Sequence, residues 1–95
     1  MQTDLGAIKK KAIGILRKHN VKRAAFFGSF ARGEQTVTSD VDILVEFEGT
    51  KSLFDLVALQ LDLQDELGTH VDVVTYNSLL PAIRENVLKE QVLIL

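Results

Sequence analysis

The chain has 95 residues, enough for one compact domain with an apolar core and too few for two domains. Apolar residues make up 46% and charged residues 25%, an ordinary globular usage that excludes a disordered chain, and the absence of cysteine excludes disulfides and thiolate metal sites. No apolar run reaches the roughly 18 residues of a membrane span, and residues 1–10 contain no apolar signal core. We therefore expect a single cytoplasmic domain over residues 1–95 that makes no membrane contact.

The net charge of −2 is unevenly distributed along the chain. The first 23 residues hold seven of the eleven basic residues and only one acidic residue, Asp4. A solvated helix face explains this run, and a patch that meets phosphate or an acidic partner is the alternative. An acidic chain of this size is a poor candidate for non-specific nucleic-acid binding, so we expect none.

A helix is predicted over residues 3–19, because apolar side chains recur there at spacings of three and four. They are Leu5, Ile8, Ala12, Ile15 and Leu16. Thr3 suits the start of this helix, and Asn20 suits its end, where a left-handed residue is tolerated.

Two strands are predicted next, over residues 21–27 and 40–47, with Gly28 closing the first. The second strand alternates with a period of two. One face of it carries Val41, Ile43, Val45 and Phe47, and the other carries Asp40, Asp42, Leu44 and Glu46.

A second helix is predicted over residues 52–67. Ser52 and Asp55 have the spacing of a capping box, and Gly68 stands where a helix C-terminal glycine belongs. The side chains expected to pack on the core are Leu53, Leu56, Val57, Leu63 and Leu67.

The remaining chain predicts a strand over residues 70–75 and a last helix to about residue 89. Asn77 or Ser78 is expected to cap that helix, with Pro81 in its first turn, and the tail "VLIL" reads as a short edge strand or a cover for the core. The long connection between residues 47 and 70 suits a crossover through a helix. The predicted fold class is α/β (α+β), with a small mixed sheet flanked by helices.

Three aspartates interrupt these strands. Asp40 and Asp42 leave one face of a strand, where two carboxylates repel each other unless a cation lies between them. Asp72 stands between valines in a core strand, where a lone carboxylate is costly to desolvate. If the two strands are neighbours, the three carboxylates converge. Such a group suits Mg²⁺, and the pair could bridge two metal ions.

Ten residues, 30–39, separate a glycine–serine turn from this pair. Gly28 allows a close approach of backbone to a ligand, and Ser29 adds a hydroxyl and an N–H beyond the strand end. Arg32 could reach an anionic oxygen with its guanidinium. By contrast, His19 and His70 are interpreted as structural or surface residues, and Glu46 lies too far along its strand to be a ligand.

The stretches "GSFARGEQTVTSDVDILVEF" and "VDVVTYNSLLPAIRENVLKE" resemble the minimal nucleotidyltransferases of the DNA polymerase β-like superfamily. The resemblance implies that Gly28 and Ser29 hold the nucleotide phosphates, with Arg32 nearby. It implies that Asp40, Asp42 and Asp72 ligate two Mg²⁺ ions, and that Asp72 helps to deprotonate the acceptor hydroxyl.

The same resemblance implies a reaction and a partner. The expected reaction is transfer of an adenylyl group from ATP to a tyrosine of an all-helical HEPN toxin, which would make the chain an antitoxin. Larger members carry an added helical domain, so a partner is expected to complete the cleft here. A non-catalytic module that masks the toxin is the alternative, transfer to a small molecule is a third reading, and a homo-oligomer stays open.

Overall fold

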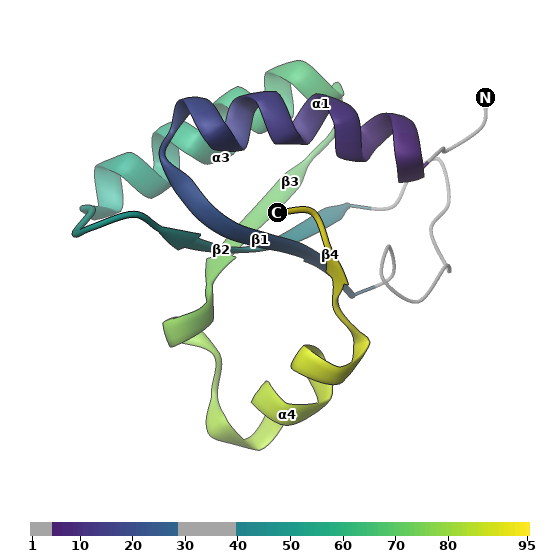
Figure 1. The fold of residues 1–95 in the computed structure, drawn as a ribbon, viewed down its shortest axis with the longest axis vertical. Coiled ribbons are helices and arrows are strands. Elements are labelled where there is room, and N and C mark those ends of the chain that lie inside the picture. Colours follow the sequence, from purple (N-terminus) through teal and green to yellow (C-terminus); the bar gives the residue numbers. More distant parts are fainter. Residues whose placement is uncertain (1–4, 29–39) are drawn as a thin grey trace.

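A computed structural model describes residues 5–28 and 40–95 of the chain (Figure 1). The elements in chain order are α1 (Leu5–Lys18), β1 (Val21–Phe27), β2 (Val41–Phe47), α3 (Leu53–Leu67), β3 (Val71–Thr75), the 3₁₀ turn η1 (Tyr76–Ser78), α4 (Pro81–Glu90) and β4 (Val92–Leu93). Helices α1 and α3 lie together on one side of the sheet, and α4 lies on the other. The predicted order of elements and the α/β class are therefore confirmed.

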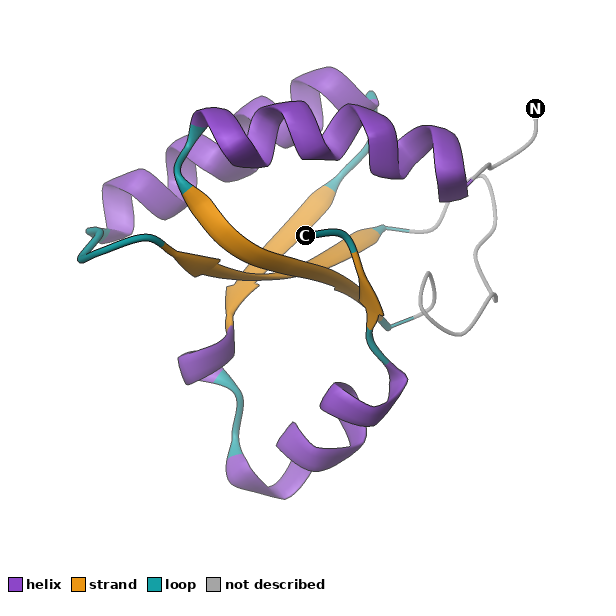
Figure 2. Cartoon of the chain, in the orientation of Figure 1, coloured by secondary structure: helices purple, strands orange, loops and turns teal. Residues whose placement is uncertain are grey.

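The sheet is mixed, with the strand order β3–β2–β1–β4 (Figure 2). Strand β1 pairs antiparallel with β2 and β4, whereas β2 pairs parallel with β3. Parallel neighbours need a crossover, and α3 provides it as predicted. Because of this crossover, β2 and β3 both begin at the same end of the sheet, where β1 ends.

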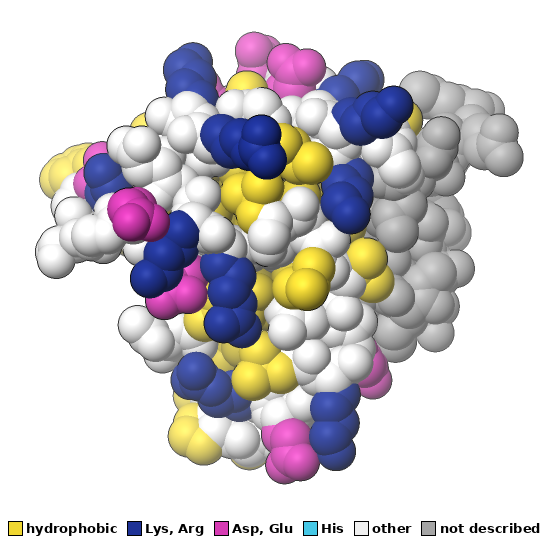
Figure 3. Space-filling view, viewed as in Figure 1, with side chains coloured by type: hydrophobic (Ala, Val, Ile, Leu, Met, Phe, Trp, Pro, Cys, Tyr) yellow, Lys and Arg dark blue, Asp and Glu magenta, His cyan; other side chains and the backbone are white. Residues whose placement is uncertain are grey.

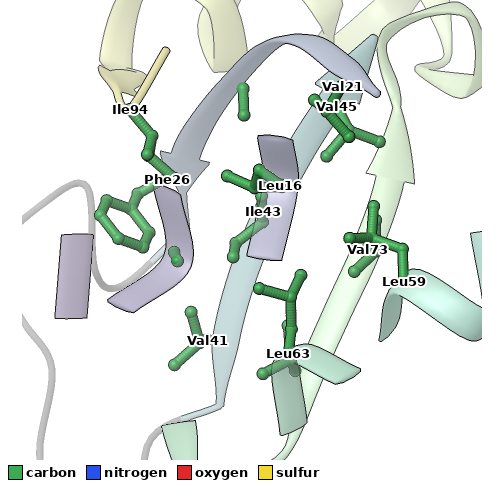
Figure 4. Close-up of a cluster of buried hydrophobic side chains, with 13 residues drawn as sticks. Leu16, Val21, Phe26, Val41, Ile43, Val45, Leu59, Leu63, Val73 and Ile94 are labelled. Carbon is green, nitrogen blue, oxygen red and sulfur yellow. The ribbon is translucent and has the colours of Figure 1, made fainter. Parts of the chain in front are cut away.

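The main core lies between the sheet and the helices α1 and α3 (Figure 4). Val41, Ile43 and Val45 are fully buried on this face of β2, which confirms the alternation that the sequence predicts. Leu44 points to the other face and packs with Tyr76 and Leu79 in a smaller cluster under η1 and α4. The sheet is thus thickly covered on one side and thinly on the other, since none of the residues of α4 is buried.

Tyr76 links three parts of the thinly covered side. Its ring is almost fully buried, and its hydroxyl donates a hydrogen bond of 2.8 Å to Oε1 of Gln91, just after α4. The guanidinium of Arg23 in β1 lies 4.2 Å from the ring centroid, within cation–π range.

Helix α3 begins and ends as predicted, and Leu56, Leu63 and Leu67 pack on the core as predicted. Ser52 and Asp55 form the capping box, and Gly68 ends the helix with a positive φ of 69°. The packing prediction was wrong for Leu53 and Val57, which are exposed. Apolar residues occur on two sides of this helix, so the periodicity is compatible with either side. The sheet takes the side that carries Leu59 and Leu63, which are fully buried.

The caps predicted for the last helix were also wrong. Asn77 and Ser78 belong to the 3₁₀ turn, and Leu80 occupies the N-cap of α4 without a side-chain hydrogen bond. Pro81 is at the start of the helix, as predicted. The tail fulfils both roles proposed for it, because Val92 and Leu93 pair with β1 while Ile94 is buried in the core.

The end of α1 is tied to α3. Asn20 adopts a positive φ of 61°, as expected for a helix end, and Nε2 of His19 lies 2.6 Å from Oδ2 of Asp62. This hydrogen bond is the largest of the causes that lower the pKa of Asp62. His19 is thus structural, as interpreted, whereas Thr3 lies outside the described residues.

Basic side chains are spread over α1 and β1 with apolar atoms between them (Figure 3). Two of them pair with acidic groups of the chain, Lys18 with Asp62 at 3.8 Å and Lys22 with Glu46 at 3.6 Å. This spread supports the solvated-face interpretation, and a role in binding phosphate or an acidic partner stays a prediction. No helix within the described ranges has the length and apolar character needed to cross a bilayer.

We predict that Leu63→Ala destabilises the protein by about 2–5 kcal/mol, since the side chain is fully buried between α3 and the sheet. Leu80→Ala, at a position that is 66% exposed, is the control and should change the free energy of unfolding by less than about 0.5 kcal/mol. Urea unfolding followed by circular dichroism measures both. Equal effects of the two variants would contradict this description of the core.

Candidate functional site

The parallel register of β2 and β3 brings two of the three aspartates side by side. Asp42 and Asp72 are direct partners in this ladder. The ladder starts one residue earlier, where the Val41 N–H donates to the His70 carbonyl at 3.0 Å. Asp40 and His70 therefore stand just before the two strands. The convergence that the sequence predicts rests on this register.

A group of potential metal ligands is exposed at this end of the sheet. Asp40, His70 and Asp72 each offer one ligand atom, and these atoms all lie within 4.8 Å of one another. Nε2 of His70 also lies 3.0 Å from Oδ1 of Asp72. Carboxylate oxygens suit Mg²⁺ and Mn²⁺, so the group fits a divalent cation.

His70 is the member that sequence reasoning missed. It is exposed, as interpreted, but its ring belongs to the acidic group. The signal was available in the spacing, because residues two apart on an extended chain project to the same side. The predicted strand over residues 70–75 already contained both residues, but a lone histidine was interpreted as structural and was not considered beside Asp72.

Asp42 is partly buried beside the other two aspartates. Its pKa is raised, first by partial burial, then by the negative charges of Asp72 and Asp40, and also by a side-chain hydrogen bond with Asp72. The charge of His70 acts weakly in the opposite direction. A divalent cation among these groups would neutralise the repulsion that raises this pKa. The carboxylates thus repel one another in the protein without metal, and a bound cation would relieve that repulsion.

Gly28 touches the same carboxylate. It follows β1, whose last residue Phe27 is the ladder partner of Asp42, and it has a positive φ of 67°. A Cβ at Gly28 would lie only 2.5 Å from Oδ2 of Asp42. Residue 28 must therefore be glycine for two reasons, the backbone angle and the missing side chain.

The other predicted phosphate-binding residues, Ser29 and Arg32, lie outside the described residues. Their roles stay predictions. Glu46 is on the same face of β2 as Asp42 but forms its ion pair with Lys22, towards the other end of the strand. This is consistent with its exclusion from the predicted ligands.

The comparison with known families matches residues 9–94 to the nucleotidyltransferase domain. The chain belongs to this family. It is a nucleotidyltransferase, and its resemblance to the minimal nucleotidyltransferases is confirmed.

Two named relatives support a finer grouping. A candidate protein adenylyltransferase of Methanocaldococcus jannaschii is 55% identical over 89 residues, which cover 94% of this chain and 96% of the relative. The protein adenylyltransferase MntA of Thermococcus cleftensis is 39% identical over 92 residues, covering 97% of this chain and 90% of MntA.

Solved structures agree with the fold. A candidate minimal nucleotidyltransferase superposes with a TM-score of 0.82 at 38% identity, and the match covers 96% of each chain. A chain from a toxin–antitoxin complex with AMP-PNP superposes with a TM-score of 0.80 at 26% identity, over 92% of this chain and 72% of that chain. The predicted mixed sheet with flanking helices is therefore the fold of this family.

We predict that Gly28→Ala abolishes the thermal stabilisation that Mg²⁺ or Mn²⁺ gives to the wild type, because the new methyl group displaces the Asp42 carboxylate. Gly49→Ala is the matched control. Its φ of 74° imposes similar backbone strain, but nothing lies within 4 Å of the added Cβ. Both variants should lose about 1 kcal/mol or more of stability, and only Gly49→Ala should keep the response to the cation. A cation response retained by Gly28→Ala would contradict the assignment.

We predict that Asp42→Asn stabilises the protein at neutral pH in the absence of divalent cations. Because the pKa of Asp42 is raised on folding, its contribution to stability is full below the unfolded pKa of about 3.9 and is lost as pH rises through the folded pKa. Ionised Asp42 thus opposes folding at pH 7, and the asparagine removes this cost. The gain in the free energy of unfolding should vanish when urea titrations are carried out below about pH 3.9.

Asp55→Asn is the control of opposite sign for this titration. Hydrogen bonds from Ser52 lower the pKa of Asp55, so its ionised form stabilises the fold at neutral pH. This variant should be less stable than the wild type at pH 7. If Asp42→Asn also lost stability there, the repulsion described for the site would not exist.

Proposed function

We propose that this protein is a cytoplasmic Mg²⁺-dependent adenylyltransferase that modifies a tyrosine hydroxyl of a partner HEPN toxin and thereby acts as its antitoxin. The observation that carries the proposal is the meeting of Asp42, Asp72 and Gly28 at one end of the sheet. The names of the relatives support adenylyl transfer to a protein, and the toxin–antitoxin neighbour that holds AMP-PNP supports ATP as donor.

The reaction places the acceptor oxygen on the α-phosphorus of ATP while pyrophosphate leaves. Divalent metal, when bound, neutralises phosphate charge and aligns the attacking and leaving oxygens. The residues of the chain that would hold it are Asp40, Asp42 and Asp72, with two ions proposed. His70 lies close to Asp40 and Asp72 and could join these two. The protein itself supplies positioning and charge rather than covalent chemistry.

Each residue has a proposed task in this arrangement. The backbone at Gly28 would admit the β- and γ-phosphates beside the carboxylates, together with Ser29 and Arg32. The half-buried Asp42 is held by the ladder and by Gly28, so it would fix the position of the metal. About half of the Asp72 side chain (49%) is exposed, so an incoming hydroxyl could reach it, and it would accept the proton of the acceptor.

The test is incubation of the purified chain with ATP labelled at the α-phosphate, Mg²⁺ and the protein encoded by the adjacent gene. Label should transfer to a tyrosine of that protein, and transfer should fall by about a hundredfold or more in Asp42→Asn and in Asp72→Asn. Glu46→Gln is the matched control, because Glu46 shares the face of β2 with Asp42 but lies away from the acidic group. It should keep full transfer.

The competing function is a non-catalytic module that masks the toxin. It predicts that the double variant Asp40→Asn, Asp42→Asn still protects cells at full strength when the toxin is expressed. Full protection by this variant, with no label transferred by the wild type, would overturn the catalytic proposal.

A further inference from the structure

Helix α3 carries a second apolar side that faces away from the core. We define the outer stripe of α3 as Leu53, Phe54, Val57 and Leu61, which are 73%, 85%, 47% and 57% exposed. With 3.6 residues per turn, Phe54, Val57 and Leu61 lie opposite the buried Leu59 and Leu63, and Leu53 lies at the edge of that side. Single exposed apolar residues are ordinary, but four within little more than two turns of one helix indicate an interaction surface.

Two large side chains of the stripe, Phe54 and Leu61, exchange places when the helix is reversed about the midpoint between Val57 and Ala58. A two-fold axis requires that each contact be repeated with the two copies exchanged. If two α3 helices lie antiparallel with the axis between Val57 and Ala58, Phe54 of one copy meets Leu61 of the other, and this contact occurs twice. Ala58 is small and exposed, so the helices can approach closely at the axis.

The charges at the two ends of the helix fit the same arrangement. Lys51 stands just before the helix and Asp65 stands in its last turn, and both are exposed. In the antiparallel register, Lys51 of each copy lies near Asp65 of the other. A parallel register would instead bring like charges together, which is unfavourable.

We propose that the outer stripe of α3 is the interface of a homodimer in which two copies of this chain pair their α3 helices antiparallel about an axis between Val57 and Ala58. The stripe is on the α1–α3 side of the sheet, whereas Asp42 and Asp72 are on the side covered by α4 (Figure 1). Both candidate sites therefore stay open in the dimer, and the proposal does not depend on the proposed function.

The test is the mass of the isolated chain in solution, by sedimentation equilibrium over a wide range of concentrations. The wild type should change from 10.6 kDa to twice that mass as concentration rises. Phe54→Ser should remain at the monomer mass throughout. Leu80→Ser, at a 66% exposed position on the other side of the sheet, is the matched control and should dimerise like the wild type. Circular dichroism confirms that each variant is folded.

A charge exchange tests the register itself. Lys51→Glu should weaken dimerisation by about tenfold, because two exposed ion pairs become repulsive. Combining it with Asp65→Lys should restore the affinity of the wild type. A double variant weaker than either single variant would overturn the antiparallel register.

Two other outcomes would overturn the dimer as a whole. One is a wild type that stays monomeric at every concentration while Phe54→Ser loses only the binding of a different protein, which would make the stripe a surface for that protein. The other is a dimer that Leu80→Ser disrupts as strongly as Phe54→Ser.

Discussion

Two carboxylates held side by side by a parallel strand register are the constraint on which the rest of this structure depends. Asp42 and Asp72 are ladder partners, so their separation is set by backbone hydrogen bonds and not by the preference of the side chains. Their neighbours in the ladder are buried valines and isoleucine, which cannot shift by one residue without exposing the core. The hydrophobic core thus stabilises an arrangement that the charges alone would disrupt.

The two faces of the sheet differ in what they contribute: one holds most of the core, and the other carries the carboxylates. The face toward α1 and α3 holds nearly all of the core, including Phe26 and Leu63. Among the described residues, the face that carries the carboxylates has the small cluster around Leu44 and a helix with no buried residue. A chain of this size can leave one end of a sheet polar because the other face carries most of the hydrophobic stabilisation. Gly28 is a second example of a local cost that the rest of the fold offsets. Its positive φ is unfavourable for most residues, but a glycine there leaves space for the Asp42 carboxylate.

The elements that could be predicted from the sequence are those that local chemistry determines. The alternation in β2, the capping box at Ser52 and the glycine at 68 each have a direct physical reason, and all three are confirmed. The core face of α3 was predicted in part, since Leu56, Leu63 and Leu67 pack on the core. Leu53 and Val57 were assigned wrongly, because they belong to a second apolar side that periodicity alone does not separate from the first. The caps at Asn77 and Ser78 failed because a 3₁₀ turn intervenes before α4. His70 was missed because a single histidine at a strand start is usually a surface residue, and only the three-dimensional neighbourhood of Asp40 and Asp72 gives it a place in the site. The roles of Ser29 and Arg32 stay predictions.

The contact between Tyr76, Arg23 and Gln91 has a spectroscopic consequence. The chain contains one tyrosine and no tryptophan, so its intrinsic ultraviolet emission comes essentially from a single ring. That ring is buried under the thin cover of the sheet and is held by β1 on one side and by the end of α4 on the other. Movement of η1 or α4 would change the quenching of the Tyr76 fluorescence, whereas the main core would contribute essentially no emission. The fluorescence of Tyr76 therefore reports on the side of the sheet on which the carboxylates lie.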